Sequence, residues 1–498
     1  MHKKMLFYIT LVLIIANLTY QEYFGLNAFI ISLSYVVITT LVRIKDNSSN
    51  FLLTKKWWLA ALLYVGNGFA IFYMNSSLSV WFYVISFFFY TAVHHQLFLS
   101  LPISILQTGQ SFFSGFYQFF ESISKLFDKK GETDKNKSVV RFLIYTIPLI
   151  IAIIFLKLYQ SADETFYEWT KFINLDWISW TFIVFYCILF IGLFGFFFYL
   201  ENKDLTKLEA SLKNNISETY TDKVESYMGV DNEKKIAMSL LITLNLMLLL
   251  YNFIDLKFIL VDLPSPNPNL RYSDLLHGGV NSLITSIILV IFILTFIYRG
   301  QLNFSGSKFI KSLAVFWLCL NLLMIATTVV KNYEYITHWG LTYKRIGVYI
   351  YLLLAAFGLV LTIIKLVRIK SLWFLIRNTS IGFLICFSAM GVVNWDKMIV
   401  QYNLTELKPE QIDFDYLLSL QDEAYPHLIA YYNDHRKDPV ITEDRPFWHI
   451  IFERFDSKKN SLKNKQLYST WRSINIRETQ LLAEMNRYNL IFISNKRR

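Results

Sequence analysis

Hydrophobic residues gather along the chain into long runs, and shorter polar segments separate these runs. A helix needs about 17–25 mostly apolar residues to cross the hydrocarbon core of a bilayer, and about eleven runs fit that length. The predicted spans cover residues 5–20, 26–42, 57–73, 78–97, 139–158, 177–200, 236–254, 279–298, 309–330, 346–367 and 373–393. The pattern therefore predicts an all-α, polytopic integral membrane bundle.

The composition supports this fold class. Of 498 residues, 54% are hydrophobic and 17% are charged, against about 25% charged residues in soluble domains. The mean hydropathy is +0.39. A soluble core cannot hide that much apolar surface, whereas lipid can cover it. The net charge of +11 does not indicate a nucleic-acid partner, because the Lys and Arg residues lie in short loops beside apolar runs, where they set orientation.

The loop charges predict how the chain threads the membrane. With Lys3 and Lys4 in the cytoplasm, most basic loops fall on the cytoplasmic side, and the base-poor loops "QEYFG", "MNSS" and "QSADETFYEWTKFINLD" fall outside. This distribution follows the positive-inside rule. One outer loop, "KNYEYITHWGLTYKR", departs from it. We expect a bacterial cytoplasmic (inner) membrane protein whose N-terminus is cytoplasmic and is retained as an uncleaved first span.

Two polar segments interrupt the bundle. Residues 101–127 alternate aromatic residues with Ser, Gln and Gly, which predicts either an interfacial amphipathic helix or a loop helix packed on the bundle. The aromatic residues that would be partly buried at the membrane surface are Phe112, Phe113, Phe116, Phe119 and Phe120. Residues 204–235 mix both charge signs and predict a solvated cytoplasmic helix.

The composition changes near residue 398, where the long apolar runs stop. We predict a transmembrane bundle over residues 1–398 and a small helical C-terminal domain over residues 399–498, outside the cytoplasm. Within it, "FDYLLSLQDEAYPHLIAYYN" predicts a helical pair, "DPVITEDRPFWHIIFERF" a turn and an aromatic helix, and "NKQLYSTWRSINIRETQLLAEMNRYN" an amphipathic helix. Its lysines are expected to form a solvated face: Lys458, Lys459, Lys463 and Lys465.

Neither a cofactor nor a metal is expected. Cys187, Cys319 and Cys386 lie far apart inside apolar runs, which is typical of small core residues rather than of ligands or disulfide partners. His94 and His95 are adjacent, so on a helix they point about 100° apart. The sequence contains no nucleotide-binding or hydrolase motif of the familiar kinds.

Polar side chains recur inside the apolar runs at helical spacing. Asn245, Asn252 and Asp255 share one stripe of their helix. Because a buried amide or carboxylate is costly in hydrocarbon, such groups usually face other helices or a cavity. We predict an outward-facing polar site formed by Asn252, Asp255, His277, Asn281, Asn332, Thr342, Lys344, Arg345, Asn394 and Asp396.

In this site Asp255 or Asp396 would neutralise Arg345, which would explain basic residues in an outer loop. The alternative is purely structural. Polar residues at span ends also cap helices, and Thr342 has the spacing of an N-cap. Interhelical Asn hydrogen bonds also hold bundles together without any ligand.

A family resemblance rests on "HGGVNSLI", "YRGQLNF", "WLCLNLLM", "KNYEYI" and "GLTYKRIGVY", which occur in this order. Together they resemble the bacterial multi-pass membrane families known as domains of unknown function four-one-five-three and four-one-seven-three. The similarity is closest over residues 241–366, and "GLTYKR" is its most specific part. The resemblance implies a helical membrane protein and supplies no catalytic residues.

Three classes of function fit these observations. A structural or regulatory role in the cell envelope needs only the bundle and the C-terminal domain, and it requires no catalysis. A transporter or permease would use the polar stripes, with Gly66, Asn67 and Gly68 as a candidate break in the third span. A membrane-embedded transferase would hold a lipid-linked or anionic substrate with Arg and Lys. The bilayer is the expected partner, and any small-molecule or lipid ligand and the oligomeric state stay open.

Overall fold

The computed structural model is helical throughout the residues that it describes, with one isolated antiparallel bridge between Asn215 and Lys370. The described residues are 2–46, 49–127, 148, 151–152, 155–156, 158–170, 180–216, 229–262, 272–298, 302–305, 308–420, 422–435 and 445–488. The predicted all-α class is confirmed. The chain divides into two compact units, of which the first holds Met1–Phe72, Tyr83–Lys207 and Thr470–Ile474 and the second holds the remainder.

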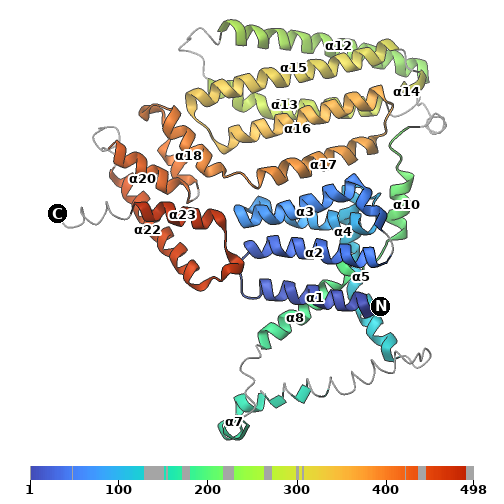
Figure 1. Ribbon diagram of the computed structural model, residues 1–498. Helices are drawn as coiled ribbons and strands as arrows, with labels where there is room; N and C mark the ends of the chain where they lie inside the picture. The colour runs from blue at the N-terminus through green and yellow to red at the C-terminus, as the bar shows by residue number, and fades with distance from the viewer. Residues whose placement is uncertain are drawn as a thin grey trace. The chain divides into compact units, whose positions relative to one another are not determined.

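The first unit contains the N-terminal helices, drawn from blue to green in Figure 1. Its elements are α1 (His2–Thr19), α2 (Leu26–Lys45), η1 (Ser49–Leu53), α3 (Lys55–Tyr73), most of α4 (Ser77–His95), α5 (Leu101–Phe127), α7 (Glu164–Thr170), α8 (Trp180–Gly192), α9 (Phe194–Phe197), the first residues of α10 (Lys203–Ser211) and η5 (Trp471–Ser473).

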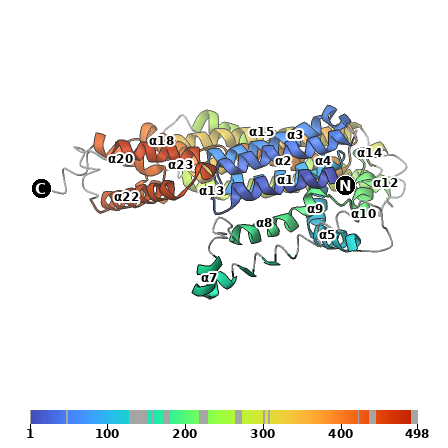
Figure 2. The same cartoon turned by 60° about the horizontal axis from the view of Figure 1, so that its bottom comes forward.

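The second unit contains the long helices drawn in green, yellow and orange and the C-terminal helices drawn in red. Its elements are α12 (Val230–Lys257), the π-helical η3 (Phe258–Asp262), α13 (Tyr272–Ile297), α14 (Leu302–Ser305), α15 (Lys308–Trp339), α16 (Tyr343–Val367), α17 (Leu372–Met390), α18 (Trp395–Glu406), η4 (Pro409–Gln411), α19 (Phe414–Ser419), α20 (Ala424–Asp434), α22 (Arg445–Tyr468) and α23 (Ile476–Arg487). In both Figure 1 and Figure 2, α18, α20, α22 and α23 lie beyond one end of α15.

Six helices of the described chain are long and apolar enough to cross a membrane. They are Leu26–Lys45, Ser77–His95, Val230–Val261, Lys308–Trp339, Tyr343–Val367 and Leu372–Met390. Three shorter apolar helices, Lys4–Thr19, Thr181–Phe197 and Thr285–Ile297, also fall on predicted spans. The predicted count of about eleven spans is not confirmed, and most of the predicted span at 139–158 lies outside the described residues.

The third predicted span is an unbroken helix, so the interruption predicted at Gly66, Asn67 and Gly68 is wrong. Asn67 Nδ2 donates to the Leu63 carbonyl of the same helix at 2.8 Å and to Ser86 Oγ on α4 at 3.3 Å. Gly68 serves packing instead, because an added Cβ would lie 2.5 Å from Ser32 Oγ on α2. Gly68 therefore allows α3 and α2 to approach closely, whereas a Cβ at Gly66 would meet nothing within 4 Å.

Helix α12 has the polarity of a lipid-facing helix. Asn245 and Asn252 are buried, whereas Leu246 and Phe253, one position further along, are 63% and 69% exposed. A helix of a soluble protein shows the reverse arrangement, with its apolar face inside. This inside-out pattern agrees with a hydrocarbon environment, in which polar groups find partners only within the protein.

The segment at 101–127 forms the single helix α5, with the predicted bounds. One face packs on α9, where Ser111 Oγ donates to the Gly195 carbonyl at 2.7 Å. The other face leaves Phe113, Tyr117 and Phe120 exposed, each by at least 60%. The helix thus packs on the unit and also presents an aromatic surface, so its interfacial position stays a prediction.

Residues 214–216 and 369–371 lie together in the second unit. They belong to two polar segments that the charge pattern places on the same side of the membrane. Ser371 N donates to the Asn214 carbonyl at 2.9 Å, and Ile216 N donates to the Ile369 carbonyl. Beside them, the buried Glu209 carboxylate pairs with Arg377 at 2.6 Å. This contact agrees with one threading direction for the chain, because it joins the polar segments that follow the sixth and tenth predicted spans.

The C-terminal helices share a core with the ends of α15 and α16. That cluster of buried residues joins Ile336, Leu341 and Ile346 to Ile399, Val400, Leu417, Leu428, Ile451, Phe455 and Met485, among others. The amphipathic helix predicted across 464–489 is interrupted, because Asn475 caps the start of α23 by accepting from Glu478 N at 3.0 Å. The boundary predicted at residue 398 stays a prediction.

Candidate functional site

The polar stripe of α12 faces α15. Asn245 Nδ2 donates to the Leu313 carbonyl at 3.1 Å, and Asn252 Nδ2 donates to the Leu320 carbonyl at 3.2 Å. Both partners advance by seven residues, so the two helices run parallel and in register. The predicted shared face is confirmed. Its amides bond one helix to the next, which is the structural use of intramembrane Asn.

Asp255 continues this stripe. It forms the one ion pair that joins the described residues of α12 and α15. Its carboxylate accepts from Thr327 Oγ1 at 2.9 Å and forms an ion pair with Lys331. Asp255 is 6% exposed, so the ammonium group neutralises a charge that hydrocarbon would not tolerate. The pairing predicted with Arg345 is wrong, because α15 extends past the predicted span and places Lys331 one turn beyond Thr327.

Arg345 closes the end of α15 instead. Its Nη1 donates to the Trp339 carbonyl at 2.7 Å and also to the Gly340 carbonyl. The guanidinium carbon lies 4.2 Å above the centroid of the Tyr335 ring. A cation is stabilised at a helix C-terminus, where carbonyl groups lack helical partners. The basic residue at the start of α16, in the segment predicted to be an outer loop, is therefore explained by helix termination rather than by an acidic partner.

Residues 340–342, here named the α15–α16 turn, are held by α18. Gly340 has a φ of +80°, a conformation that favours glycine. Asn403 Oδ1 accepts from Leu341 N at 2.6 Å, and its Nδ2 donates to the Leu341 carbonyl at 2.9 Å. The Tyr343 hydroxyl donates to Asp396 Oδ1 at 2.8 Å. These bonds connect the quoted segment "GLTYKR" to the C-terminal helices.

Several predicted site residues act as helix caps or bridges. Thr342 caps α16 by accepting from Arg345 N at 3.4 Å, and Asn394 caps α18 by accepting from Lys397 N at 3.1 Å. Asn332 Nδ2 donates to the Arg345 carbonyl at 3.2 Å. The spacing of Thr342 predicted its capping role correctly.

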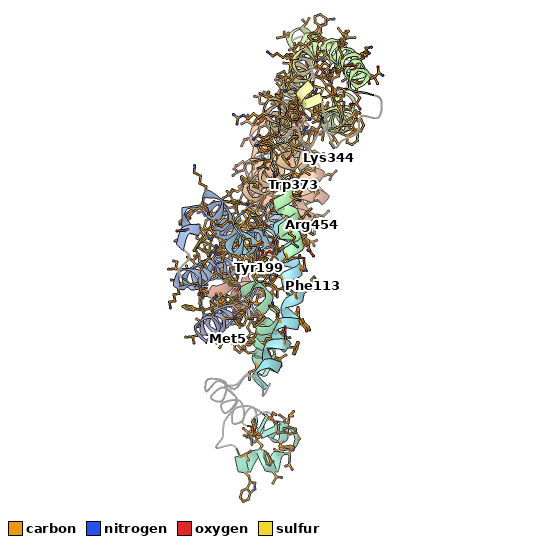
Figure 3. All side chains as sticks on the ribbon, turned by 90° about the vertical axis from the view of Figure 1, so that its right-hand side faces the viewer. Met5, Phe113, Tyr199, Lys344, Trp373 and Arg454 are labelled. Carbon is orange, nitrogen blue, oxygen red and sulfur yellow. The ribbon has the colours of Figure 1, made fainter. Side chains whose placement is uncertain are left out.

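The structure describes fewer contacts for the remaining predicted residues. Lys344, which is labelled in Figure 3, is exposed. His277 and Asn281 belong to α13, and their side chains lie outside the described residues. The described contacts form two groups: Asn252 and Asp255 of α12 contact α15, while Asn332, Thr342, Arg345 and Asp396 lie around the α15–α16 turn. A single site that unites them stays a prediction.

A family model described as "Domain of unknown function (DUF4153)" matches residues 5–431. The chain belongs to this family. The DUF4153 match includes both the polar stripe and the α15–α16 turn, and it confirms the resemblance read from the short motifs. No curated protein and no solved structure matches the chain.

The DUF4153 region also has a groove of about 450 Å³ between α12, α13 and α15. Apolar side chains such as Met247, Leu289 and Met324 form most of its lining, and Ser286 and Asn321 add polar groups. Tyr251 also lines it, one helical turn before Asp255. The groove has the chemistry of a site for an alkyl chain.

Other sequence expectations are corrected by burial. Cys187 and Cys319 are exposed rather than core residues, and all three cysteines are free thiols. Lys459 is buried and donates to the Met485 carbonyl at 2.8 Å, so it does not belong to a solvated face. Within the described residues, no group of three His, Cys, Asp or Glu side chains is placed to hold a metal ion.

Lys331 and Asn403 are two of the residues in these contacts that the sequence did not single out. Lys331 could have been found, because it lies four residues after Thr327. The two side chains therefore share the helix face that meets Asp255. Asn403 gave no such signal, because its role depends on a turn 62 residues away.

Proposed function

We propose that this DUF4153 protein is an integral protein of a bacterial cytoplasmic membrane with a structural or regulatory role in the cell envelope. Its N-terminus lies in the cytoplasm, and its C-terminal helices lie on the opposite side. The helices α18–α23 face the envelope there and are coupled to the spans. The apolar helices and the loop charges support this placement.

One observation is central to the proposal: the C-terminal helices and the ends of α15 and α16 have a common core. Leu417 and Ile399 are fully buried in it together with Ile336 from α15. A close-packed core transmits displacement because it cannot deform continuously. A molecule that shifts the C-terminal helices would therefore also shift two spans.

The polar stripe favours this role over transport. The Nδ2 groups of Asn245 and Asn252 donate to α15 carbonyl groups, and Asp255 is neutralised by Lys331. Alternating access usually relies on discontinuous helices near mid-depth, and the candidate discontinuity in α3 is a regular helix.

Complementation of a deletion strain under envelope stress tests the proposal. Leu417→Asp, which disrupts the common core, should fail to restore growth in detergent while the protein still inserts. Asp255→Asn should restore growth, and Gln401→Ala, at an exposed position of α18, is the matched control. If Asp255→Asn failed and Leu417→Asp succeeded, an intramembrane transport role would replace the proposed one.

The groove between α12, α13 and α15 favours a second candidate function, the binding or modification of a lipid-linked substrate. It would accept an alkyl chain, and the Asp255–Lys331 pair beyond Tyr251 would lie near the polar end of such a molecule. A photoreactive lipid should label α13, and Ser286→Trp should reduce the labelling by filling the groove. Thr243→Trp, at an exposed site of α12, should not. Equal labelling of both variants would remove the candidate.

A further inference from the structure

The first unit contains a pocket of about 420 Å³ whose lining combines charge with aromatic surface. It lies where α1 begins and where α2 and α4 end, the ends that face the reader in Figure 3. Met5 and Tyr199 are labelled there. Lys4 comes from α1, Arg43 and Asp46 come from the end of α2, and His94 and His95 come from the end of α4. Segments far apart in the sequence therefore supply its polar groups.

The charges of the lining do not cancel. Asp46 Oδ2 pairs with Lys4 Nζ at 2.6 Å, and both side chains are nearly half exposed, so this pair lies at the mouth. Arg43 lines the pocket further in and lies 4.4 Å above the centroid of the Phe51 ring. With neutral imidazoles, two cations and one carboxylate give the pocket a net charge of about +1.

The other walls are rigid and partly apolar. His94 Nδ1 accepts from Trp57 Nε1 at 3.2 Å, and the His95 ring stacks on the Tyr199 ring with centroids 4.6 Å apart. Phe197 and Phe198 complete the lining. A planar, stacked wall beside a bidentate donor suits a phosphate group that is attached to a larger organic body.

We propose that this pocket binds a monoanionic phosphodiester through Arg43 and Lys4, with the attached group against Phe198 and Tyr199. Its single negative charge matches the net charge of the lining. The helix ends place the pocket at the depth of lipid head groups, so the phosphodiester can belong to an anionic phospholipid or to a soluble phosphodiester.

The alternative is that these basic residues only orient the chain in the bilayer, as the positive-inside rule describes. Lys45 provides the comparison, because it lies in the last turn of α2 with Arg43, contacts the Phe7 ring at 4.5 Å and does not line the pocket. General attraction to lipid would depend on Lys45 and Arg43 alike, whereas a pocket would depend on Arg43.

Native mass spectrometry of the full chain, titrated with phosphatidylglycerol in detergent, tests the proposal. Wild type and Lys45→Gln should retain one lipid molecule with equal affinity. Arg43→Gln should weaken retention by about fivefold or more, the effect of one basic contact at a membrane surface. Arg43→Lys should restore part of the affinity, which separates loss of charge from misfolding, and gel filtration should show all variants monodisperse.

Two further arms identify the source of the phosphodiester. Phosphatidylcholine should bind more weakly than phosphatidylglycerol if the ligand is an anionic lipid. Millimolar glycerophosphoglycerol, the soluble monoanionic phosphodiester that remains when phosphatidylglycerol loses its acyl chains, should displace the lipid only if a soluble phosphodiester is the ligand. Equal losses in Arg43→Gln and Lys45→Gln, or no retained lipid in any variant, would overturn the proposal.

Discussion

The Asn403 side chain forms two hydrogen bonds with the backbone of Leu341, accepting from its amide at 2.6 Å and donating to its carbonyl at 2.9 Å. The side chain of Asn403 thereby bonds the backbone amide and carbonyl of Leu341, which lies between α15 and α16 and belongs to neither helix. Asn403 is 5% exposed, so water cannot replace it. This pair connects the C-terminal helices to the membrane spans.

Replacing Asn403 should therefore loosen the C-terminal helices. Asn403→Ala leaves a buried amide and a buried carbonyl unpaired, which costs about 1–3 kcal/mol for each unsatisfied group. We expect a lower midpoint of thermal unfolding in detergent and faster protease cleavage after residue 395. Gln401→Ala, on the exposed face of the same helix, should unfold like wild type. An unchanged midpoint in Asn403→Ala would show that the two bonds do not hold the turn.

Gly340 should tolerate no side chain. A Cβ there would lie 2.4 Å from Asn403 Oδ1, and φ is +80°. Gly340→Ala should destabilise the protein by at least about 1 kcal/mol through left-handed strain and displacement of Asn403. Gly347→Ala on α16, where nothing lies within 4 Å, should be neutral or stabilising because Ala favours a helix. Thermal unfolding compares the two, and equal midpoints would contradict the geometry.

The ion pair of Asp255 and Lys331 should behave as a coupled unit. Asp255→Asn leaves an uncompensated ammonium group beside hydrocarbon and should lower stability by roughly 1–3 kcal/mol, less than for a fully buried pair because Lys331 is partly exposed. The double variant Asp255→Asn with Lys331→Gln should recover most of that loss. Urea unfolding in micelles measures the cycle. Additive effects of the two changes would mean that the side chains do not interact.

His427 should make the C-terminal helices sensitive to acid. Burial on α20 lowers its pKa, and Lys397 adds to the effect while Glu484 opposes it. Because the folded pKa lies below the value of about 6.5 for an exposed imidazole, the folded state favours the neutral ring. The stability contribution is complete above that value and is lost as the pH falls through the lower, folded pKa.

Thermal unfolding measured between about pH 7 and pH 5 checks this sign. The midpoint should fall with pH in wild type and fall less in His427→Gln. His449→Gln, whose imidazole is 73% exposed, should retain the wild-type slope. A slope that is steeper in His427→Gln than in wild type would assign the acid sensitivity elsewhere.

Periodicity predicted the α12 stripe because the spacing of Asn245, Asn252 and Asp255 depends only on helix geometry. It did not identify the partners of these residues, because hydropathy ended the ninth span at residue 330 while α15 continues to Trp339. The charge of Lys331 made that turn resemble a loop.

The segment 331–345, which the sequence predicted to be a loop, illustrates the converse limit. Its basic residues suggested a ligand site because loop charge is normally read as topology or binding. In the structure, Arg345 donates to carbonyl groups at the end of α15, and Asn403 accepts from the backbone amide of Leu341. The Asn403 contact depends on tertiary packing, because its partner lies 62 residues away, and a single sequence does not show such a partner.

The placement of the C-terminal helices is tested most directly by labelling single cysteines in intact cells with a membrane-impermeant maleimide. The background replaces Cys187, Cys319 and Cys386 with Ala. Tyr468→Cys, at a position that is 89% exposed, should react before permeabilisation, whereas Arg368→Cys, in the exposed segment between α16 and α17, should react only afterwards. Labelling of Arg368→Cys but not of Tyr468→Cys in intact cells would contradict the threading of the chain and the position of its C-terminal helices.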